Sequence, residues 1–417
     1  MAVFSEIDEC RACGSSRLSS ILSLGELFVS NFVDSENDET IRAPLELVLC
    51  ANCSLLQLRH TVSSQAMYRN YWYRSGMNKT MMLALADIAS KAEQLVQINE
   101  NDIALDIGCN DGTLLRSYGD KRLKRVGFEP AINLLQYAEK ETTKIINDFF
   151  NFGDFQKNFP QQKAKIITSI AMFYDLDNPN KFVADVVKCL HHDGVWVIEM
   201  HYLPKVLSQN AFDAVCHEHL EIYSLLSLEN LLKTHDLEAF DIELNEVNGG
   251  SFRVYVKHKS GKIKPFKGAE KRLAYLRKAE KGLKISEKKI YLDFASRVER
   301  IKDQVGGFIK REALKGKKIF VYGASTKGNT LLQYFGLDWK LITAAAERNP
   351  DKWGKKTVGT LIPIVSEEQA RAKKPDYFLV LPWHFLKEFT ERESQFLESG
   401  GKFIVPLPKF RIIGYKT

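Results

Sequence analysis

The sequence contains no apolar run long enough to span a bilayer, and its opening residues, MAVFSEIDEC, lack the basic and then apolar layout of a secretory signal. These two absences predict a cytoplasmic protein without a membrane partner. No internal repeat or low-complexity tract stands out. With 417 residues, of which 45% are hydrophobic and 27% charged, the chain should fold into two or three globular domains.

Cysteine is scarce, and most of it is paired. Four of the seven cysteines form two Cys-x-x-Cys pairs, Cys10 with Cys13 and Cys50 with Cys53, and 36 residues separate the pairs. Four thiolates complete a tetrahedral zinc shell and leave no open position, so we expect structural zinc in a module spanning residues 1–65. The strand-like LELVL before the second pair fits a zinc-ribbon knuckle. Two redox-active pairs are the alternative, but no thioredoxin-like strand and helix surround them.

The net charge of +7 is unevenly distributed. Residues 257–318 hold 21 Lys/Arg and 7 Asp/Glu, a net of +14, so the rest of the chain sums to −7. Apolar residues recur there at helical spacing, namely Leu273, Leu276, Leu283, Ile290, Phe294, Val298 and Ile301. This pattern predicts a basic helical connector over 259–315 with an apolar inner stripe. The alternative is a surface that attracts a phosphorylated ligand or nucleic acid.

A strand, a glycine loop, a helix and a second strand follow one another in the segment 66–258. The run IALDIGCNDGTLLRSYG supplies the first three and RVGFEP the fourth. A glycine turn lets the backbone approach a ligand, and the following helix N-terminus adds a partial positive charge. Glu129, 21 residues beyond Gly108, stands where a carboxylate accepts hydrogen bonds from ribose hydroxyls. The later runs KIITSIAMFYDL and FVADVVKCLHHDGVWVIEM continue the alternation of strand and helix.

The spacing Asp-x-Gly-x-x-x-Gly differs from the Gly-x-Gly-x-x-Gly of dinucleotide enzymes. With an acid after the second strand, it resembles the first motifs of class I S-adenosylmethionine-dependent methyltransferases. The resemblance implies a Rossmann-like domain that binds this cofactor through Asp106, Gly108, Asn110, Gly112 and Glu129. Asp148, in IINDFF, is the candidate for the adenine amino group.

The last segment, 316–417, again begins with an apolar strand, a small-residue loop and a helix, in KKIFVYGASTKGNTLLQYFG. The later strand-like runs PDYFLVLPW and GGKFIVPLP predict a second Rossmann-like α/β domain. The loop is not a Walker loop, because the glycine before Lys327 is missing. Loop amides and Lys327 could hold a diphosphate; the alternative is a tight turn with an exposed lysine.

Residues 216–223 read CHEHLEIY and allow three interpretations. A metal site is disfavoured because the histidines are two apart, whereas the zinc metalloprotease motif spaces them four apart on a helix. A polar patch without chemistry and an acid/base device remain. Histidine suits the latter because it titrates near neutral pH.

Four stretches in order resemble the sugar C-methyltransferases that add a methyl branch to carbon 3 of nucleotide-linked keto-deoxysugars. They are the double Cys-x-x-Cys opening with LSLGELFVSNF and YWYRSG, the LDIGCNDGTLL loop with GFEP, HEHLEIYS with NGGSFRVYV, and VYGASTKGNTLL. The resemblance spans nearly the whole chain. It implies a zinc module, a central methyltransferase domain and a C-terminal α/β domain, with the nucleotide sugar between the last two.

The resemblance also implies roles for residues. His219 would be the general base, with Glu218 beside it and Tyr73 from the N-terminal segment. Two positions depart from the family: relatives often carry tyrosine where Cys216 stands and histidine near Tyr174. Both positions line the sugar pocket in similar enzymes, so the sugar or its stereochemistry can differ here.

Carbon methylation needs a base that forms an enolate and a group that stabilises the enolate oxygen. Glu218 could fix a ring tautomer or bind a sugar hydroxyl. Tyr73, Tyr174, His217 or Asn248 could serve the oxygen, and Arg253 could reach a phosphate. Gly249 and Gly250 either form a purely structural turn or lie near the sugar. The sequence selects neither the nucleotide nor the oligomeric state.

Two other functions compete with this interpretation. An RNA or DNA base methyltransferase would grip phosphates with the zinc module and the basic connector. However, AMFYDL is not the Asn/Asp-Pro-Pro-aromatic motif of amino-directed base methylation, so we expect no nucleic-acid partner. A non-catalytic protein that binds nucleotide sugars is the second alternative, favoured only by Cys216.

Overall fold

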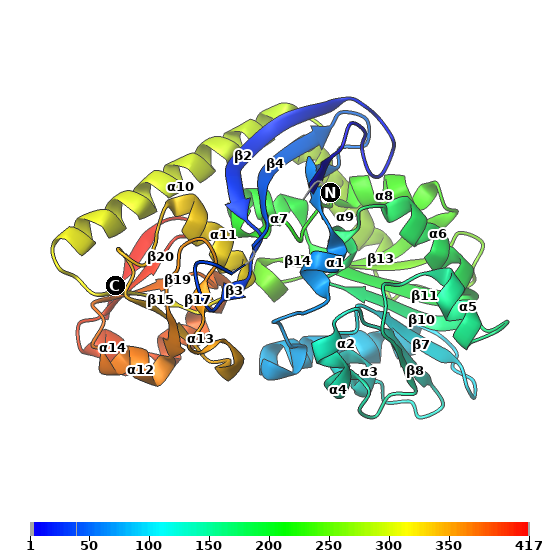
Figure 1. The fold of residues 1–417 in the computed structure, drawn as a ribbon. Helices are drawn as coiled ribbons and strands as arrows, with labels where there is room; N and C mark the ends of the chain where they lie inside the picture. Colours follow the sequence, from blue (N-terminus) through cyan, green and yellow to red (C-terminus); the bar gives the residue numbers. More distant parts are fainter. Residues whose placement is uncertain (1–3, 39, 416–417) are drawn as a thin grey trace.

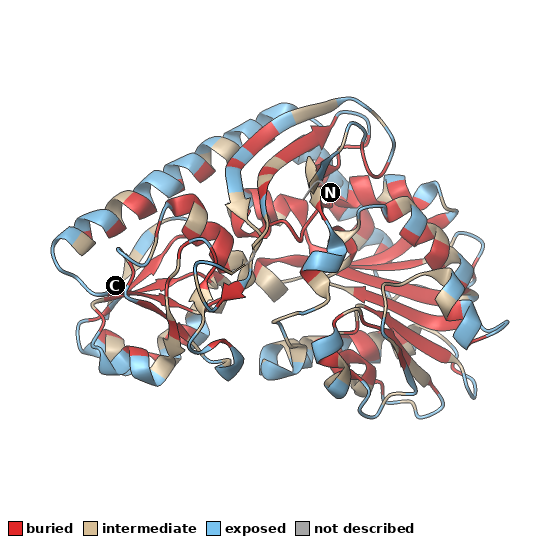
Figure 2. Ribbon diagram, in the orientation of Figure 1, coloured by how far each residue is buried: buried red, intermediate tan, exposed pale blue. Residues whose placement is uncertain are grey.

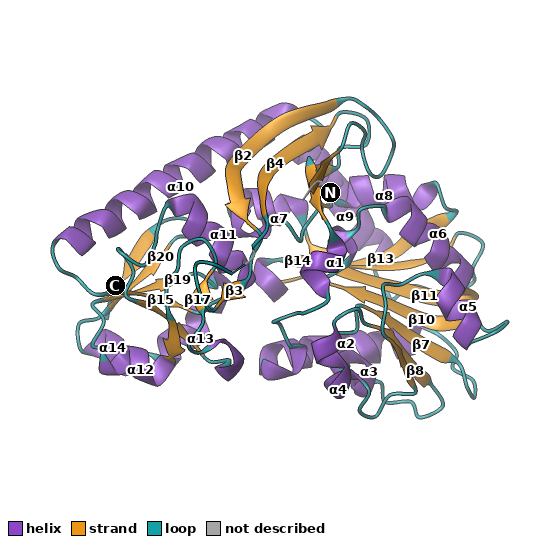
Figure 3. Cartoon of the chain, in the orientation of Figure 1, coloured by secondary structure: helices purple, strands orange, loops and turns teal. Residues whose placement is uncertain are grey.

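The computed structural model describes residues 4–38 and 40–415, in which two twisted sheets lie side by side and are bridged by N-terminal strands and a long helix (Figure 1). Residues 1–3 of the predicted zinc module and 416–417 of the predicted C-terminal domain lie outside the described residues. Figure 3 shows that strands and helices alternate in both sheet regions, as the sequence predicts for α/β domains.

The N-terminal strands form a small antiparallel sheet in the order β12-β5-β4-β2. The strands in this part of the chain are β1 (Phe4–Glu6), β2 (Leu18–Phe28), β3 (Phe32–Val33), β4 (Arg42–Cys50), β5 (Leu56–Leu58) and β6 (His60–Val62). The run LELVL lies in β4, as expected. The fourth strand of the sheet, β12 (Glu221–Ile222), comes from CHEHLEIY and pairs with β5. The zinc module is therefore joined directly to the segment with the histidines.

The central sheet has seven strands in the order β13-β14-β11-β10-β7-β8-β9. Their bounds are β7 (Ile103–Ile107), β8 (Lys124–Phe128), β9 (Lys144–Ile146), β10 (Ala164–Ile170), β11 (Leu190–His201), β13 (Leu237–Asn245) and β14 (Ser251–His258). Only β14 runs against its neighbours, since β11 and β13 both pair with it antiparallel. Strand order reverses between β7 and β10, so a crevice opens at the carboxyl ends of these two strands.

Helices cover both faces of the central sheet (Figure 1). They are α2 (Lys79–Leu95), α3 (Thr113–Ser117), α4 (Leu135–Ala138), α5 (Phe152–Asn158), α6 (Pro179–Cys189) and α8 (Leu225–Lys233). Two further helices pack elsewhere: α1 (Ser64–Tyr68) against the N-terminal strands and α7 (Leu203–Ser208) in the cluster that includes the C-terminal sheet. The strands are apolar on both faces, as a sheet between two helical layers requires: β7 reads IALDI and is buried throughout.

The basic segment forms two helices, α9 (Ala269–Leu283) and α10 (Lys288–Leu314). The predicted apolar stripe is confirmed at Phe294, Val298 and Ile301, which are buried. Figure 2 shows the buried positions alternating with exposed ones along α10, as an amphipathic helix requires. Leu283, the last residue of α9, is 45% exposed, and Ile290 is only half-buried.

The C-terminal sheet has six strands in the order β18-β16-β15-β19-β20-β21. Its strands are β15 (Ile319–Tyr322), β16 (Ala344–Glu347), β18 (Ile364–Ser366), β19 (Tyr377–Val380), β20 (Lys402–Val405) and β21 (Arg411–Ile413). The helices are α11 (Thr326–Phe335), α12 (Glu367–Ala372), α13 (Leu386–Arg392) and α14 (Ser394–Glu398). All pairings are parallel except β20 with β21. From β15 the chain adds β16 and β18 on one side and then β19 and β20 on the other, so a second crevice opens between β15 and β19.

The N-terminal strands also contact the C-terminal domain, which the sequence did not predict. β3 pairs antiparallel with β17 (Lys356–Thr357). The Gln333 side chain donates to the carbonyl of Phe28 and accepts from its amide, at 3.1 and 2.8 Å. The zinc module thus contacts both larger α/β domains. Among the described residues, no helix is both long and apolar enough to cross a membrane.

Candidate active site

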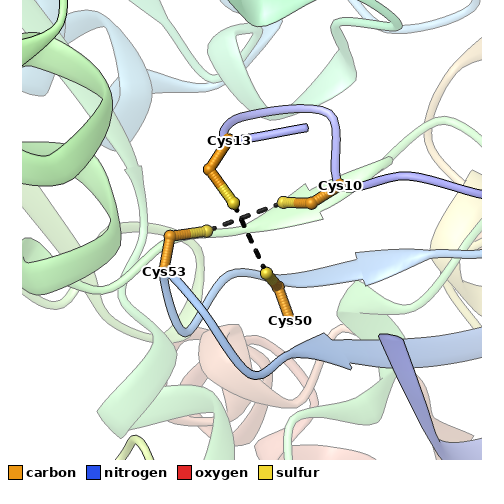
Figure 4. Close-up of side chains that lie close together, drawn as sticks. All are labelled: Cys10, Cys13, Cys50 and Cys53. Atoms are coloured by element: carbon orange, nitrogen blue, oxygen red, sulfur yellow. Dashed lines mark hydrogen bonds between the residues drawn. The ribbon is translucent and has the colours of Figure 1, made fainter. Parts of the chain in front are cut away.

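The four predicted zinc ligands converge (Figure 4). The Sγ atoms of Cys10 and Cys53 lie 3.6 Å apart, as do those of Cys13 and Cys50, and all four sulfurs lie within 4.8 Å of one another. Tetrahedral zinc with Zn–S bonds of ~2.3 Å requires S···S separations of ~3.8 Å, so the geometry fits. The Gln57 side chain donates to Cys10 Sγ at 3.2 Å, a contact suited to a thiolate. The cluster is a structural zinc site.

The predicted cofactor residues lie at the carboxyl ends of β7 and β8. Glu129 accepts from the amides of Asn110 and Ala131 at 2.7 and 2.9 Å, so it is fixed against the glycine loop. The buried Asp106 accepts from the hydroxyl of Thr168 at 2.6 Å, and burial raises its pKa to about 7. Of the predicted set, Asp106, Gly108, Asn110, Glu129 and Asp148 line one cavity. Gly112 instead caps α3 with a φ of 76° and lies outside the lining.

The segment YWYRSG closes over the glycine loop. The amide of Ser75 donates to Asn110 Oδ1 at 2.9 Å, and the Asn110 side chain donates back to the carbonyl of Tyr73 at 3.0 Å. The amide of Gly76 donates to Asp111 at 2.8 Å. Tyr73 reaches the cavity in this way and remains 44% exposed. The sequence did not single out Asp111, although an acid within a glycine loop is a natural acceptor for such a segment.

One cavity of about 1020 Å³ joins the two crevices. Gly108 and Tyr174, after β7 and β10, line it from the central sheet, and Gly323, Lys327 and His384, after β15 and β19, line it from the C-terminal sheet. Its volume lies at the upper end of the roughly 300–1,000 Å³ range of ligand pockets, and its lining is shared by both crevices. The two crevices meet inside this cavity.

His219 and Glu218 stand at this junction. His219 is 8% exposed, and its Nδ1 lies 2.8 Å from the carbonyl oxygen of Ala214. A carbonyl only accepts, so Nδ1 carries the proton and Nε2 keeps its lone pair. Burial and the charge of Lys327 lower the pKa of His219 to about 3, which keeps the ring neutral. The ring of Tyr174 packs against it at a centroid distance of 4.4 Å.

Three predicted residues do not face the cavity, which corrects the sequence-based assignment. His217 points toward the N-terminal sheet, where Nε2 donates to the carbonyl of Ala43 at 2.9 Å. Arg253 is 3% exposed and is committed to Glu199 and Asp87, both at 2.7 Å, so it is not available for a phosphate. Cys216 is buried beneath the cavity lining.

The predicted substrate residue Asn248 lies on the cavity wall in a left-handed conformation, with a φ of 54°. Gly249 and Gly250 follow with φ of 88° and 126°. A Cβ on Gly249 would lie 2.9 Å from the Trp383 ring, so the glycine lets a loop of the C-terminal domain approach. The turn is structural, and it also places Asn248 in the cavity.

Three polar residues of the site escaped the sequence analysis. His201 ends β11 and accepts from Lys327 Nζ at 2.8 Å. Asp213 lines the cavity and accepts from the indole of Trp383 at 3.1 Å. Asp175, also in the lining, follows Tyr174 directly. The signal for His201 was its position at the carboxyl end of a buried strand, where open α/β sheets bind their ligands.

The Sγ, carboxylate and ring nitrogen atoms of Cys216, Glu218 and His219 lie within 4.8 Å of one another. The CHEHLEIY segment thus gathers three potential ligands in spite of its unfavourable spacing. The neighbouring Lys327 acts on all three groups with its positive charge, which disfavours a second cation.

Glu218 should make stability depend on pH. Burial raises its pKa from the ordinary 4.5 to about 7, against the opposing charge of Lys327. Between these values the folded chain holds a proton that the unfolded chain has lost, so this stabilising contribution is full below pH 4.5 and disappears as pH rises through 7. Glu218→Gln cannot titrate, so its stability relative to the wild type should rise across that window, by up to about 3 kcal/mol.

Thermal unfolding of both proteins without ligands, from about pH 5 to about pH 7.5, measures this difference. The exposed Glu36→Gln is the matched control and should follow the wild type throughout. A constant difference between Glu218→Gln and the wild type would contradict the raised pKa.

The central sheet and its crevice, with a glycine loop and a carboxylate after the second strand, define a methyltransferase that uses S-adenosylmethionine. Three family models match the chain in order: "Putative zinc binding domain" at 10–68, "Methyltransferase domain" at 73–241 and "C-methyltransferase C-terminal domain" at 246–408. The chain is 30% identical to the C-methyltransferase NovU of Streptomyces niveus, over 99% of this chain and 98% of that protein. It belongs to the C-methyltransferase family.

Solved structures similar to part of the chain include the plantazolicin methyltransferase BpumL in complex with SAH. That match has a TM-score of 0.33 and 14% identity and covers 42% of this chain and 83% of that one. An S-adenosylmethionine-dependent methyltransferase from Clostridium acetobutylicum also has a TM-score of 0.33, with 16% identity, 42% of this chain and 91% of that one.

Proposed function

We propose that this enzyme methylates carbon 3 of a nucleotide-linked 4-keto-deoxysugar in branched-chain sugar biosynthesis. The observation that carries the proposal is the single cavity between two switch-point crevices, with His219 at the junction. One crevice suits the methyl donor and leaves the other for a nucleotide. The resemblance to sugar C-methyltransferases across nearly the whole chain supports the same substrate class.

The residues for the cofactor are those of the first crevice. Glu129, held by two amides, is positioned for ribose hydroxyls, and Gly108 lets a ligand approach the backbone. Asp148 is the candidate for the adenine amino group, although it also pairs with Arg69 at 3.0 Å. When bound, S-adenosylmethionine supplies an electrophilic methyl group.

His219 is the base in this proposal. Its proton on Nδ1 is committed to the carbonyl of Ala214, which leaves Nε2 free to accept a proton from the carbon beside the ketone. Glu218 does not share a hydrogen bond with the ring in the described structure, so we assign it to a sugar hydroxyl rather than to tautomer control. Tyr73, Tyr174 and Asn248 complete the wall around the sugar.

A substrate screen tests the proposed class. Keto-deoxysugars linked to dTDP, GDP and CDP are incubated with isotopically labelled S-adenosylmethionine, and the products are read by mass. We expect methyl transfer to at least one keto sugar and none to the matched sugar whose ketone is reduced to an alcohol. Equal transfer to the alcohol, or transfer only to RNA or DNA, would refute the proposal.

A further inference from the structure

The Lys327 side chain reaches from the C-terminal domain to the central sheet. Lys327 lies in the first turn of α11, which follows the loop after β15 of the C-terminal sheet. Its Nζ lies 2.8 Å from Nε2 of His201, the last residue of β11 in the central sheet. Burial holds the pKa of His201 well below its usual value, so the ring is neutral and accepts from the ammonium group. The hydrogen bond fixes the Lys327 side chain at the interface.

This contact places the ammonium group beside the base. The rings of His201 and His219 lie 5.5 Å apart, and Tyr174 packs against both, at 5.4 and 4.4 Å. Burial raises the pKa of Glu218 against the opposing charge of Lys327, and burial together with that charge lowers the pKa of His219, so Lys327 acts on both groups. A cation therefore stands close to the proton acceptor.

Other cations serve the nucleotide end of the cavity. Arg348 and Arg392 line it from the ends of β16 and α13, and Arg348 is exposed. Lys352 lines it as well, with Nζ donating to the carbonyl of Ala324 at 2.8 Å. Arg392 is held by Glu367 and Glu388 at 3.1 and 2.9 Å, whereas the exposed Arg348 lies 3.8 Å from Glu388. Arg348 can therefore meet an anionic diphosphate on this wall, and Lys327 is not required for that role.

His219 is a weak base, because burial and the charge of Lys327 both lower its pKa. A histidine with a pKa near 3 is a poor acceptor for a proton on carbon, and an ammonium group next to it would only reduce the rate if it served no other purpose. The same ammonium group offsets the low basicity of His219 if it stabilises the negative charge that develops on the ketone oxygen. Removing one preorganised donor of this kind typically costs about 2.7–4 kcal/mol of transition-state stabilisation.

We propose that Lys327 is a catalytic residue whose ammonium group, held by His201, donates a hydrogen bond to the enolate oxygen of the substrate; this role rests on the proposed function. The C–H bond breaks as its proton passes to Nε2 of His219, and its electron pair forms a C=C bond while the carbonyl π pair moves to oxygen. The oxygen pair then re-forms the ketone, and the C=C pair bonds to the methyl carbon. The S–CH₃ pair stays on sulfur, and S-adenosylhomocysteine leaves. His219 returns its proton to water, and Lys327 keeps its own.

Lys327→Met and Lys327→Arg test this role on the full-length enzyme, with the keto sugar that the wild type methylates. We expect Lys327→Met to lower kcat by about 10²- to 10³-fold and Lys327→Arg to recover part of the loss. The KM, and the Kd of the matching nucleoside diphosphate without sugar, should stay within about threefold. Exchange of the sugar's α-proton in D₂O, with S-adenosylhomocysteine bound, should fall in parallel with kcat.

Lys340→Met, an exposed lysine of the same domain, is the control for loss of charge and should match the wild type. If Lys327→Met does not fold, Lys327→Gln keeps a donor for His201 and takes its place. Loss of nucleoside diphosphate affinity by about tenfold or more with unchanged kcat would overturn the proposal and assign Lys327 to the diphosphate. A wild-type enzyme that methylates no keto sugar would refute the proposed function instead, and this role with it.

Discussion

His219→Ala should reduce methyl transfer by about 10²- to 10⁴-fold while leaving the affinity for S-adenosylhomocysteine within a few-fold. The side chain lines the cavity where the two crevices meet, and its Nδ1 is committed to the carbonyl of Ala214. Only Nε2 is therefore available for the substrate. Gly108 and Glu129, the proposed cofactor residues, line the cavity from the carboxyl ends of β7 and β8, so the variant should still bind the cofactor product.

His217→Gln provides the contrast, because His217 is only two residues away and donates to Ala43 instead. That change should lower thermal stability and spare kcat. Single-turnover methyl transfer and calorimetric binding of S-adenosylhomocysteine measure the two quantities separately. Loss of cofactor binding in a folded His219→Ala protein, or a rate close to that of the wild type, would contradict the assignment of the base.

Loss of zinc should destabilise the whole enzyme and abolish activity. The four cysteines hold together a sheet that pairs through β5 with β12, next to His219, and through β3 with β17 of the C-terminal domain. Structural zinc contributes roughly 10–16 kcal/mol in small zinc domains. Cys50→Ser should therefore lower the thermal midpoint by about 10 °C or more and separate the two crevices.

Elemental analysis should find one zinc per chain in the wild type and none in the variant. Cys189→Ser is the matched control: Cys189 is a buried cysteine outside the cluster, so the zinc content should not change. Zinc-free protein with wild-type stability would refute the structural role. A second tightly held metal would place an ion at Cys216, Glu218 and His219 instead.

Local sequence patterns predicted much of the fold because they act over short distances. The cysteine pairs, the glycine loop with Glu129, and the apolar stripe at Phe294 and Val298 each combine residue type with a fixed spacing. Such features determine an element without reference to the rest of the chain. The α/β class, the Rossmann-like methyltransferase domain and the zinc module followed from them.

The contacts between domains could not be predicted in this way. That Gln333 would hold Phe28, or that Lys327 would reach His201, depends on pairings 305 and 126 residues apart in the sequence. The direction in which a side chain points was equally hidden. His217 and His219 are equivalent in the sequence, yet in the turn that precedes β12, where the amide of His219 donates to the carbonyl of Cys216, one ring meets Ala43 and the other lines the cavity.

The most direct test of the account is the position of the transferred methyl group. The enzyme is supplied with a donor carrying a ¹³C-methyl group, and the product of the best keto sugar is examined by NMR. We predict a methyl signal coupled to a ring carbon next to the ketone, together with loss of one proton from that carbon. A methyl group on oxygen or nitrogen would contradict the enolate chemistry and the roles of His219 and Lys327.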